Sequence, residues 1–159
     1  MLGKKVIYVI DDDGLCRNMI ERLVKNEHGS FVLKTFCSCE AGYKFIMKQE
    51  NFSLKEYPDL IFLADNLSSN CIRNFLIMIE KLNLSINKEI QVYFLLDIHK
   101  KEIDSISLNN VVVKGSIQKP VFPHDIFKII QSFKGISSRL ENVGNYDFLI
   151  SKLNLLTLG

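Results

Sequence analysis

The chain has 159 residues, of which 47% are hydrophobic and 24% are charged, and its formal net charge is +2. This composition predicts one globular domain and excludes a disordered tail, and the small charge gives no global field that would attract nucleic acid or an acidic membrane. No apolar run is long enough to span a bilayer or to act as a signal peptide, so we expect a cytoplasmic protein that recognises its partners locally.

Apolar, β-branched runs bounded by polar or turn residues predict five buried strands. In chain order these runs lie at residues 6–10, 31–36, 60–64, 90–96 and 111–117. Each run is short, and the first, third and fourth end directly at acidic residues. Such runs are typical of strands in a parallel sheet that is covered on both faces.

Apolar residues at helical spacing follow each predicted strand. The predicted helices begin at Leu15, after a serine cap at Ser38, and at residues 71–84, 99–108 and 123–133, of which 99–108 has the weakest apolar face. Strands that alternate with helices indicate an α/β fold with a five-stranded parallel sheet between two helical layers.

Residues 135–159 stand outside this alternation, which leaves residues 1–134 as the domain. The extension contains a loose, Ser- and Gly-containing connection and then an apolar stretch within residues 146–158. A stretch so apolar should be covered. We expect an extra helix here, which either packs on its own domain or pairs with another chain.

Acidic residues and one lysine gather where the predicted strands end. Asp11, Asp12 and Asp13 follow the first strand, and Lys119 follows the fifth. Ligands of open parallel sheets bind at this edge, and crowded carboxylates need a hard cation such as Mg²⁺ or an ammonium group such as that of Lys119. The simpler interpretation is that the three aspartates only cap the following helix.

The four cysteines show no zinc-type arrangement of paired ligands. They are Cys16, Cys37, Cys39 and Cys71. We expect them to be reduced thiols buried in the core.

Three stretches together resemble the receiver domains of response regulators, the CheY-like phosphoacceptor domains of two-component signalling. They are VIYVIDDDGLCR at 6–17, YPDLIFLADNL at 57–67 and IQKP at 117–120. The resemblance covers about residues 4–134 and implies a flavodoxin-like (βα)5 fold. It further implies that Asp11 and Asp12 hold Mg²⁺, that Lys119 contacts a phosphoryl group, and that the partner is a histidine kinase or another two-component signalling protein.

The chain departs from the family pattern at three functional positions. With Asn66 fixing the register, the phosphoacceptor position falls on Ala64, the hydroxyl position on Leu96 and the switch aromatic on Ser116. This pattern resembles a degenerate receiver, or pseudo-receiver, which is no enzyme and works by protein–protein interaction.

The same departures weaken the expected cation site. The candidate ligands that remain are Asp11, Asp12 and Asn66, which predict weak Mg²⁺ binding. We expect Lys119 to pair directly with Asp11 or Asp12 instead.

Other interpretations stay open at this point. Asp65 could replace the missing acceptor if a bulge at the strand end turned it toward Lys119. A homodimer could form through the face of the fourth helix, fifth strand and fifth helix, or through the C-terminal helix. More remotely, Asp11 and Asp13 resemble the nucleophile and the general acid of haloacid-dehalogenase phosphatases. That family, however, has a threonine where this chain has Leu15, and it has a late acidic pair that this chain lacks.

Overall fold

A computed structural model describes residues 4–27, 31–49, 56–97 and 110–133. The chain divides into two compact units, Met1–Val121 and Phe122–Gly159, which we describe separately. The helix expected at 99–108 and the extension expected at 135–159 lie outside the described residues. No helix in the described ranges is long and apolar enough to cross a membrane.

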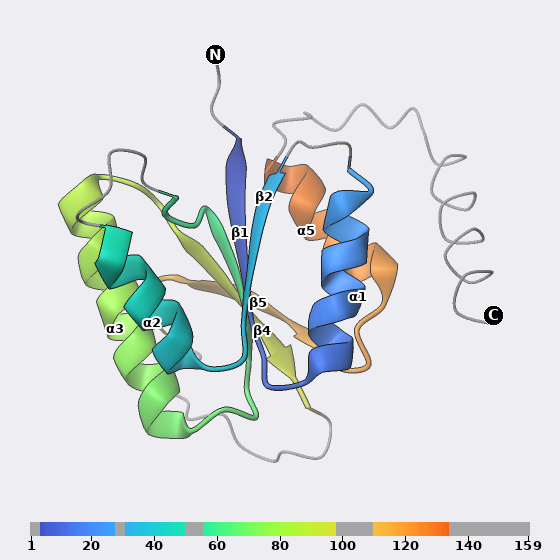
Figure 1. Cartoon of the computed structure of the whole chain (residues 1–159), viewed down its shortest axis with the longest axis horizontal. Coiled ribbons are helices and arrows are strands. Elements are labelled where there is room, and N and C mark those ends of the chain that lie inside the picture. The colour runs from blue at the N-terminus through green and yellow to red at the C-terminus, as the bar shows by residue number, and fades with distance from the viewer. Residues whose placement is uncertain (1–3, 28–30, 50–55, 98–109, 134–159) are drawn as a thin grey trace. The chain divides into compact units, whose positions relative to one another are not determined.

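The first unit contains a five-stranded, all-parallel sheet (Figure 1). Its strands are β1 (Lys5–Ile10), β2 (Phe31–Phe36), β3 (Leu60–Ala64), β4 (Gln91–Leu96) and β5 (Val113–Gln118), and they lie in the order β2-β1-β3-β4-β5. Every residue of β3 is buried, as is every residue of β1 after Lys5. This burial explains the continuous apolar runs, and the predicted α/β fold with a parallel sheet is confirmed.

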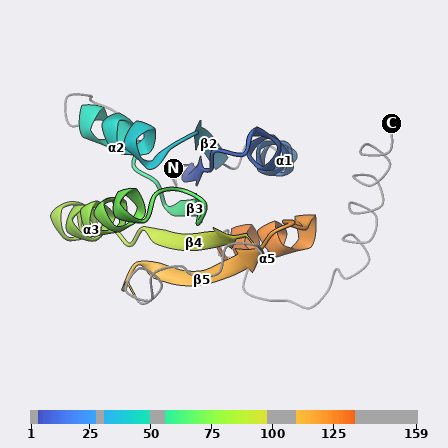
Figure 2. The ribbon, with the colours of Figure 1, turned by 90° about the horizontal axis from the view of Figure 1, so that it is seen from below.

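Helices cover both faces of the sheet in this unit. Figures 1 and 2 show α1 (Gly14–Lys25) on one face and α2 (Cys39–Lys48) beside α3 (Ser69–Ile86) on the other. Asp13 caps α1 by accepting the Leu15 N–H, and Ser38 caps α2 by accepting the Ala41 N–H. These caps place each helix directly after the strand that precedes it.

The second unit contributes one described helix, α5 (Pro123–Phe133). It has the bounds that the sequence predicts, with Pro123 at the first helical position, where its missing N–H costs least. Ile126, Phe127 and Ile130 are its buried residues.

Asp59 lies at the amino edge of the sheet, where the parallel strands begin, and it is 8% exposed. Its carboxylate accepts the Val6 N–H at 2.7 Å and lies 3.2 Å from Lys88 Nζ and 3.5 Å from Lys5 Nζ. Because these residues belong to or adjoin β1, β3 and β4, the cluster stabilises three strands at their starts.

We expect the central strand to dominate stability. Ile7 is 1% exposed, so Ile7→Ala should lower the free energy of unfolding by about 2 to 4 kcal/mol through loss of buried surface and the cavity left behind. Leu15→Ala is the matched control, since Leu15 is 82% exposed and its truncation should change stability by less than about 0.5 kcal/mol. Urea unfolding of both variants tests this, and equal effects would contradict the assigned core.

Candidate functional site

The carboxyl ends of the parallel strands bring the predicted site residues to one edge of the sheet. Backbone hydrogen bonds continue the ladder into this edge: Asp11 N–H donates to Phe36 O at 3.1 Å, Asp65 N–H to Leu95 O at 3.0 Å and Lys119 N–H to Leu96 O at 2.7 Å. The residues that follow β1, β3 and β5 are therefore held by the sheet rather than by free loops.

A buried ion pair joins two of them. Lys119 Nζ lies 2.8 Å from Asp11 Oδ2, the Asp11 side chain is fully buried, and that of Lys119 is 15% exposed. The other carboxylate oxygen of Asp11 accepts the Asp13 N–H at 2.9 Å. Of the two pairings that the sequence allowed for Lys119, the structure has the one with Asp11.

Burial and the neighbouring carboxylate act in opposite directions on the Lys119 ammonium. Burial alone would lower the pKa of Lys119, because it disfavours the charged form. Attraction by Asp11, with smaller contributions from Cys16 and Asp13, outweighs this and raises the pKa of Lys119 above its ordinary value. The Lys119 side chain is therefore positively charged at neutral pH.

Between the two members of this pair lie the ends of β3 and β4. Ala64 closes β3 with a fully buried methyl group, and it pairs in register with Leu95. The next residue, Asp65, is 4% exposed, and its Oδ1 accepts the Asp97 N–H at 3.0 Å. The register shift in this part of the sheet lies between β4 and β5, at Val92/Tyr93, whereas β3 and β4 pair regularly to Ala64.

A second polar contact lies beside the ion pair. Asn66 Nδ2 donates to Asp12 Oδ1, and the buried Oδ1 of Asn66 has no hydrogen-bond partner among the residues that the structure describes. Asp13 serves as the cap of α1, so capping accounts for one of the three aspartates and leaves Asp11 and Asp12 with other contacts. In the described ranges, no three His, Cys, Asp or Glu side chains are grouped as a metal ligand set.

The remaining predicted positions are Leu96, whose backbone carbonyl accepts the Lys119 N–H, and Ser116. Leu96 ends β4 and is partly exposed, while Ser116 lies exposed on the edge strand β5, opposite Phe94. Two neighbours of Asp11 were not predicted from the sequence: the Arg17 guanidinium, which donates to the Asp11 carbonyl oxygen, and the thiol of Cys16. Both residues lie in the first turns of α1, a few positions after Asp11, and this spacing could have indicated that they are near it.

The cysteines are distributed differently from the sequence prediction. Cys16 and Cys39 are buried, but Cys37 and Cys71 are exposed, so the expectation of four buried thiols is wrong for those two. Cys37 lies just after β2, and Cys71 lies in the first turn of α3. Burial, together with the nearby Asp11 carboxylate, raises the pKa of Cys16 to about 12.

Comparison with solved structures identifies the fold. A CheY-like receiver domain from Methanospirillum hungatei JF-1 matches with a TM-score of 0.60 and 19% identity, covering 84% of this chain and 96% of that one. The Mn²⁺-bound form of response regulator Rcp1 matches with a TM-score of 0.60 and 25% identity, covering 87% and 96%. This chain has the CheY-like receiver fold.

A two-component response regulator from Legionella pneumophila shares this receiver fold, with a TM-score of 0.60, 22% identity and coverage of 82% of this chain and 99% of that one. No family model and no curated protein matches the sequence. The receiver fold is thus recognised from its three-dimensional arrangement, in agreement with the resemblance of the three motifs.

The ion pair of this receiver fold should be needed for stability. Lys119→Met leaves the buried Asp11 carboxylate without its counter-charge, so it should lower the free energy of unfolding at pH 7 by about 3 kcal/mol. Because the folded pKa of Lys119 is raised, the stabilisation is fully present below its ordinary value of 10.5 and is lost as the pH rises through the raised value.

Urea unfolding of the parent and Lys119→Met should therefore show a constant gap from pH 7 to about pH 10 that narrows at higher pH. The double variant Asp11→Asn, Lys119→Met is the control, and it should recover most of the loss because no buried charge remains. A Lys119→Met protein as stable as the parent would contradict a structural role for the pair.

Proposed function

We propose that this chain is a receiver-type domain of a two-component signalling pathway that lacks a phosphoacceptor and acts, without catalysis, by binding another protein. The observation that carries this proposal is the pairing of Lys119 with Asp11 at an edge where β3 ends in the methyl group of Ala64. The proposed partner is a histidine kinase or another protein of such a pathway.

The chemistry of phosphoryl transfer supports the proposal. Accepting a phosphoryl group requires an oxygen nucleophile, and a methyl group has none. Leu96 supplies no hydroxyl to contact a phosphoryl group, and Ser116 supplies no aromatic ring to respond to it. A domain without these parts has no means to convert phosphorylation into movement, so its binding surfaces should stay in one state.

The donor set does not fit tight Mg²⁺ binding. Mg²⁺ requires near-octahedral oxygen ligands, and it usually takes them from carboxylates and waters. One oxygen of Asp11 faces the Lys119 ammonium and the other accepts a backbone N–H, while Asp12 Oδ1 accepts the Asn66 amide. We therefore propose that any Mg²⁺ binding at Asp11, Asp12 and Asn66 is weak.

A second candidate function is an active receiver that uses Asp65 as its acceptor. Asp65 favours it by lying at the carboxyl edge of the sheet, directly after Ala64. Against it, one oxygen of Asp65 accepts the Asp97 N–H, which orients that carboxylate toward the end of β4. A phosphatase with Asp11 as nucleophile has less support still, because Asp11 is fully buried and paired with Lys119.

Phosphorylation distinguishes the first two candidates. After incubation with acetyl phosphate and Mg²⁺, we expect intact-protein mass spectrometry to show no added phosphoryl group, since the edge lacks a nucleophile at residue 64. Beryllofluoride should likewise leave amide chemical shifts around Lys119 unchanged. An added phosphoryl group that Asp65→Asn removes would establish the Asp65 candidate and overturn our proposal.

Restoring the missing carboxylate should restore cation affinity. Calorimetric titration with Mg²⁺ should give weak binding to the parent and binding at least about tenfold tighter to Ala64→Asp, because a third carboxylate then faces the edge. Ala64→Asn is the matched control of nearly equal size without the charge, and circular dichroism verifies that each variant folds. Micromolar Mg²⁺ affinity of the parent would contradict the proposal.

A further inference from the structure

Two of the four cysteines lie in the first turns of neighbouring helices. Cys39 begins α2, and Cys71 lies in the first turn of α3. A serine caps each helix: Ser38 precedes Cys39, and Ser68 accepts the Cys71 N–H. Because α2 and α3 both follow strands of a parallel sheet and cover the same face of it, their first turns lie together at the carboxyl edge (Figures 1 and 2).

The packing one turn further along shows that the two cysteines lie on facing sides of these helices. Gly42 follows Cys39 by three residues, and residues at this spacing share one side of a helix. Phe75 follows Cys71 by four residues, with the same consequence for α3. A Cβ added at Gly42 would lie 3.5 Å from Phe75 Cε2, so the helices are in contact there. Both cysteines also line one groove between α2 and α3, so their thiols share the same space.

The two thiols differ in their access to solvent. Cys71 is exposed, whereas Cys39 is 3% exposed. Burial, and after it the neighbouring Cys71 sulfur, raises the pKa of Cys39 to about 12, so Cys39 keeps its proton at neutral pH. A small oxidant in solution therefore meets Cys71 first, while Cys39 lies sheltered beside it.

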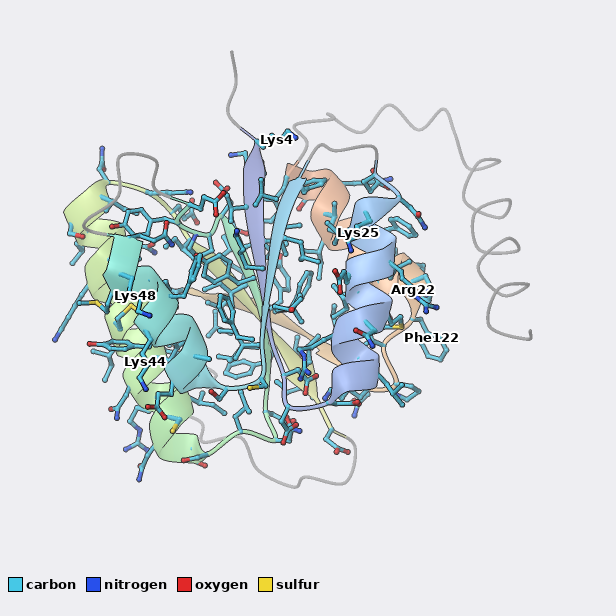
Figure 3. All side chains as sticks on the ribbon, viewed as in Figure 1. Lys4, Arg22, Lys25, Lys44, Lys48 and Phe122 are labelled. Atoms are coloured by element: carbon cyan, nitrogen blue, oxygen red, sulfur yellow. The ribbon has the colours of Figure 1, made fainter. Side chains whose placement is uncertain are left out.

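The acidic residue in the described lining of the groove is neutralised. Glu40 follows Cys39 directly, and Lys44 Nζ lies 2.7 Å from its carboxylate. Figure 3 shows Lys44 on α2. An unpaired carboxylate beside a thiol would oppose formation of the thiolate, which is the form that reacts with oxidants. The Glu40–Lys44 pair reduces that opposition.

We propose that Cys39 and Cys71 are a redox-sensitive pair, in which a peroxide converts the two thiols into a disulfide that joins the start of α2 to the start of α3. Both thiols are free in the structure, which therefore has the reduced form of the pair. The inference goes beyond the proposed function and does not depend on it, since neither cysteine is a member of the Lys119–Asp11 ion pair.

The oxidation takes two steps. In the first, the Cys71 thiolate attacks one oxygen of hydrogen peroxide and the O–O bond breaks. The other oxygen leaves as hydroxide and takes up the proton that Cys71 lost, which gives water and a sulfenic acid on Cys71. In the second, the Cys39 sulfur attacks the sulfenic sulfur, the S–S bond forms, and the S–O bond breaks; the hydroxyl leaves with the Cys39 proton as water. Two thiols and one peroxide thus become one disulfide and two waters, and two electrons pass from the sulfurs to the peroxide.

Peptide mapping of the full chain tests the proposal. The protein is treated with hydrogen peroxide, its remaining thiols are alkylated, and it is digested with trypsin in the absence of a reductant. We expect the peptide of residues 35–44, which contains Cys37 and Cys39, to be linked to the peptide of residues 56–73, which contains Cys71. The linked species should disappear after treatment with dithiothreitol, because the disulfide is reversible.

Serine variants assign the sulfur atoms of the link. Cys39→Ser and Cys71→Ser should abolish the link between the two peptides, whereas Cys37→Ser, the matched control, should retain it. Cys71 and Cys37 are both exposed, so neither of these two changes should disturb the core, and circular dichroism verifies that every variant folds. In urea the parent should form a mixture of pairings, because the helices no longer hold Cys39 beside Cys71.

Four results would overturn the proposal. They are the absence of any link, a link made by Cys37 in place of Cys39, a link between two chains on non-reducing electrophoresis, and sulfinic acid on Cys71 without a link. The last result would show that the Cys39 sulfur does not reach Cys71 in the folded chain.

Discussion

The buried ion pair between Lys119 and Asp11 determines the character of the carboxyl edge of the sheet. The two residues follow β5 and β1, which are separated in the sheet by β3 and β4, so the ion pair joins the ends of strands that are not neighbours. A fully buried carboxylate without a counter-charge is costly, and Ala64 places no second charge between them. The charge of the buried Asp11 carboxylate is therefore balanced by a lysine of the same chain.

The amino edge offers an instructive contrast. There too a carboxylate meets ammonium groups, since Asp59 lies near Lys5 and Lys88, but the lysine side chains are 51% and 30% exposed. Water screens such pairs, so their attraction contributes little, and the Asp59 hydrogen bond to the Val6 backbone is the more specific contact. The Lys119–Asp11 pair is less exposed to solvent, so it should be better ordered than the pairs at the other edge.

Much of this arrangement follows from local sequence rules, and the exceptions have identifiable physical causes. The bounds of β2 and β3 match the predicted runs because polar residues end both strands, and the cap at Ser38 was readable because a serine precedes helical spacing. The end of α3 was not predicted: it extends to Ile86 because Asn87 takes the left-handed conformation, with φ of 50°. Burial of Cys37 and Cys71 was wrongly expected because composition ignores where a turn or a helix points its side chains.

The candidate site, too, could be predicted only in part from the sequence. That Lys119 lies at the same edge of the sheet as Asp11 and Asp12 follows from the parallel order of the strands. The sequence does not show which aspartate pairs with the lysine. The direction of each aspartate side chain depends on the backbone conformation after the strand ends, and the sequence pattern does not reveal that conformation. The separate roles of Asp11, Asp12 and Asp13, as ion pair, amide acceptor and helix cap, emerge only from their contacts.

The ion pair and the packing of α2 are linked through the end of β1. Ile10, directly before Asp11, packs on Gly42 of α2, where an added Cβ would lie 3.0 Å from Ile10 Cδ1 and 3.5 Å from Phe75 Cε2. A side chain at residue 42 would therefore push α2 away from both β1 and α3. The same strand end carries Asp11, so the packing of α2 and the ion pair with Lys119 meet at the end of β1. A strand end that is packed and paired in this way favours surfaces that stay in one state, which is what the proposed receiver domain without a phosphoacceptor would require.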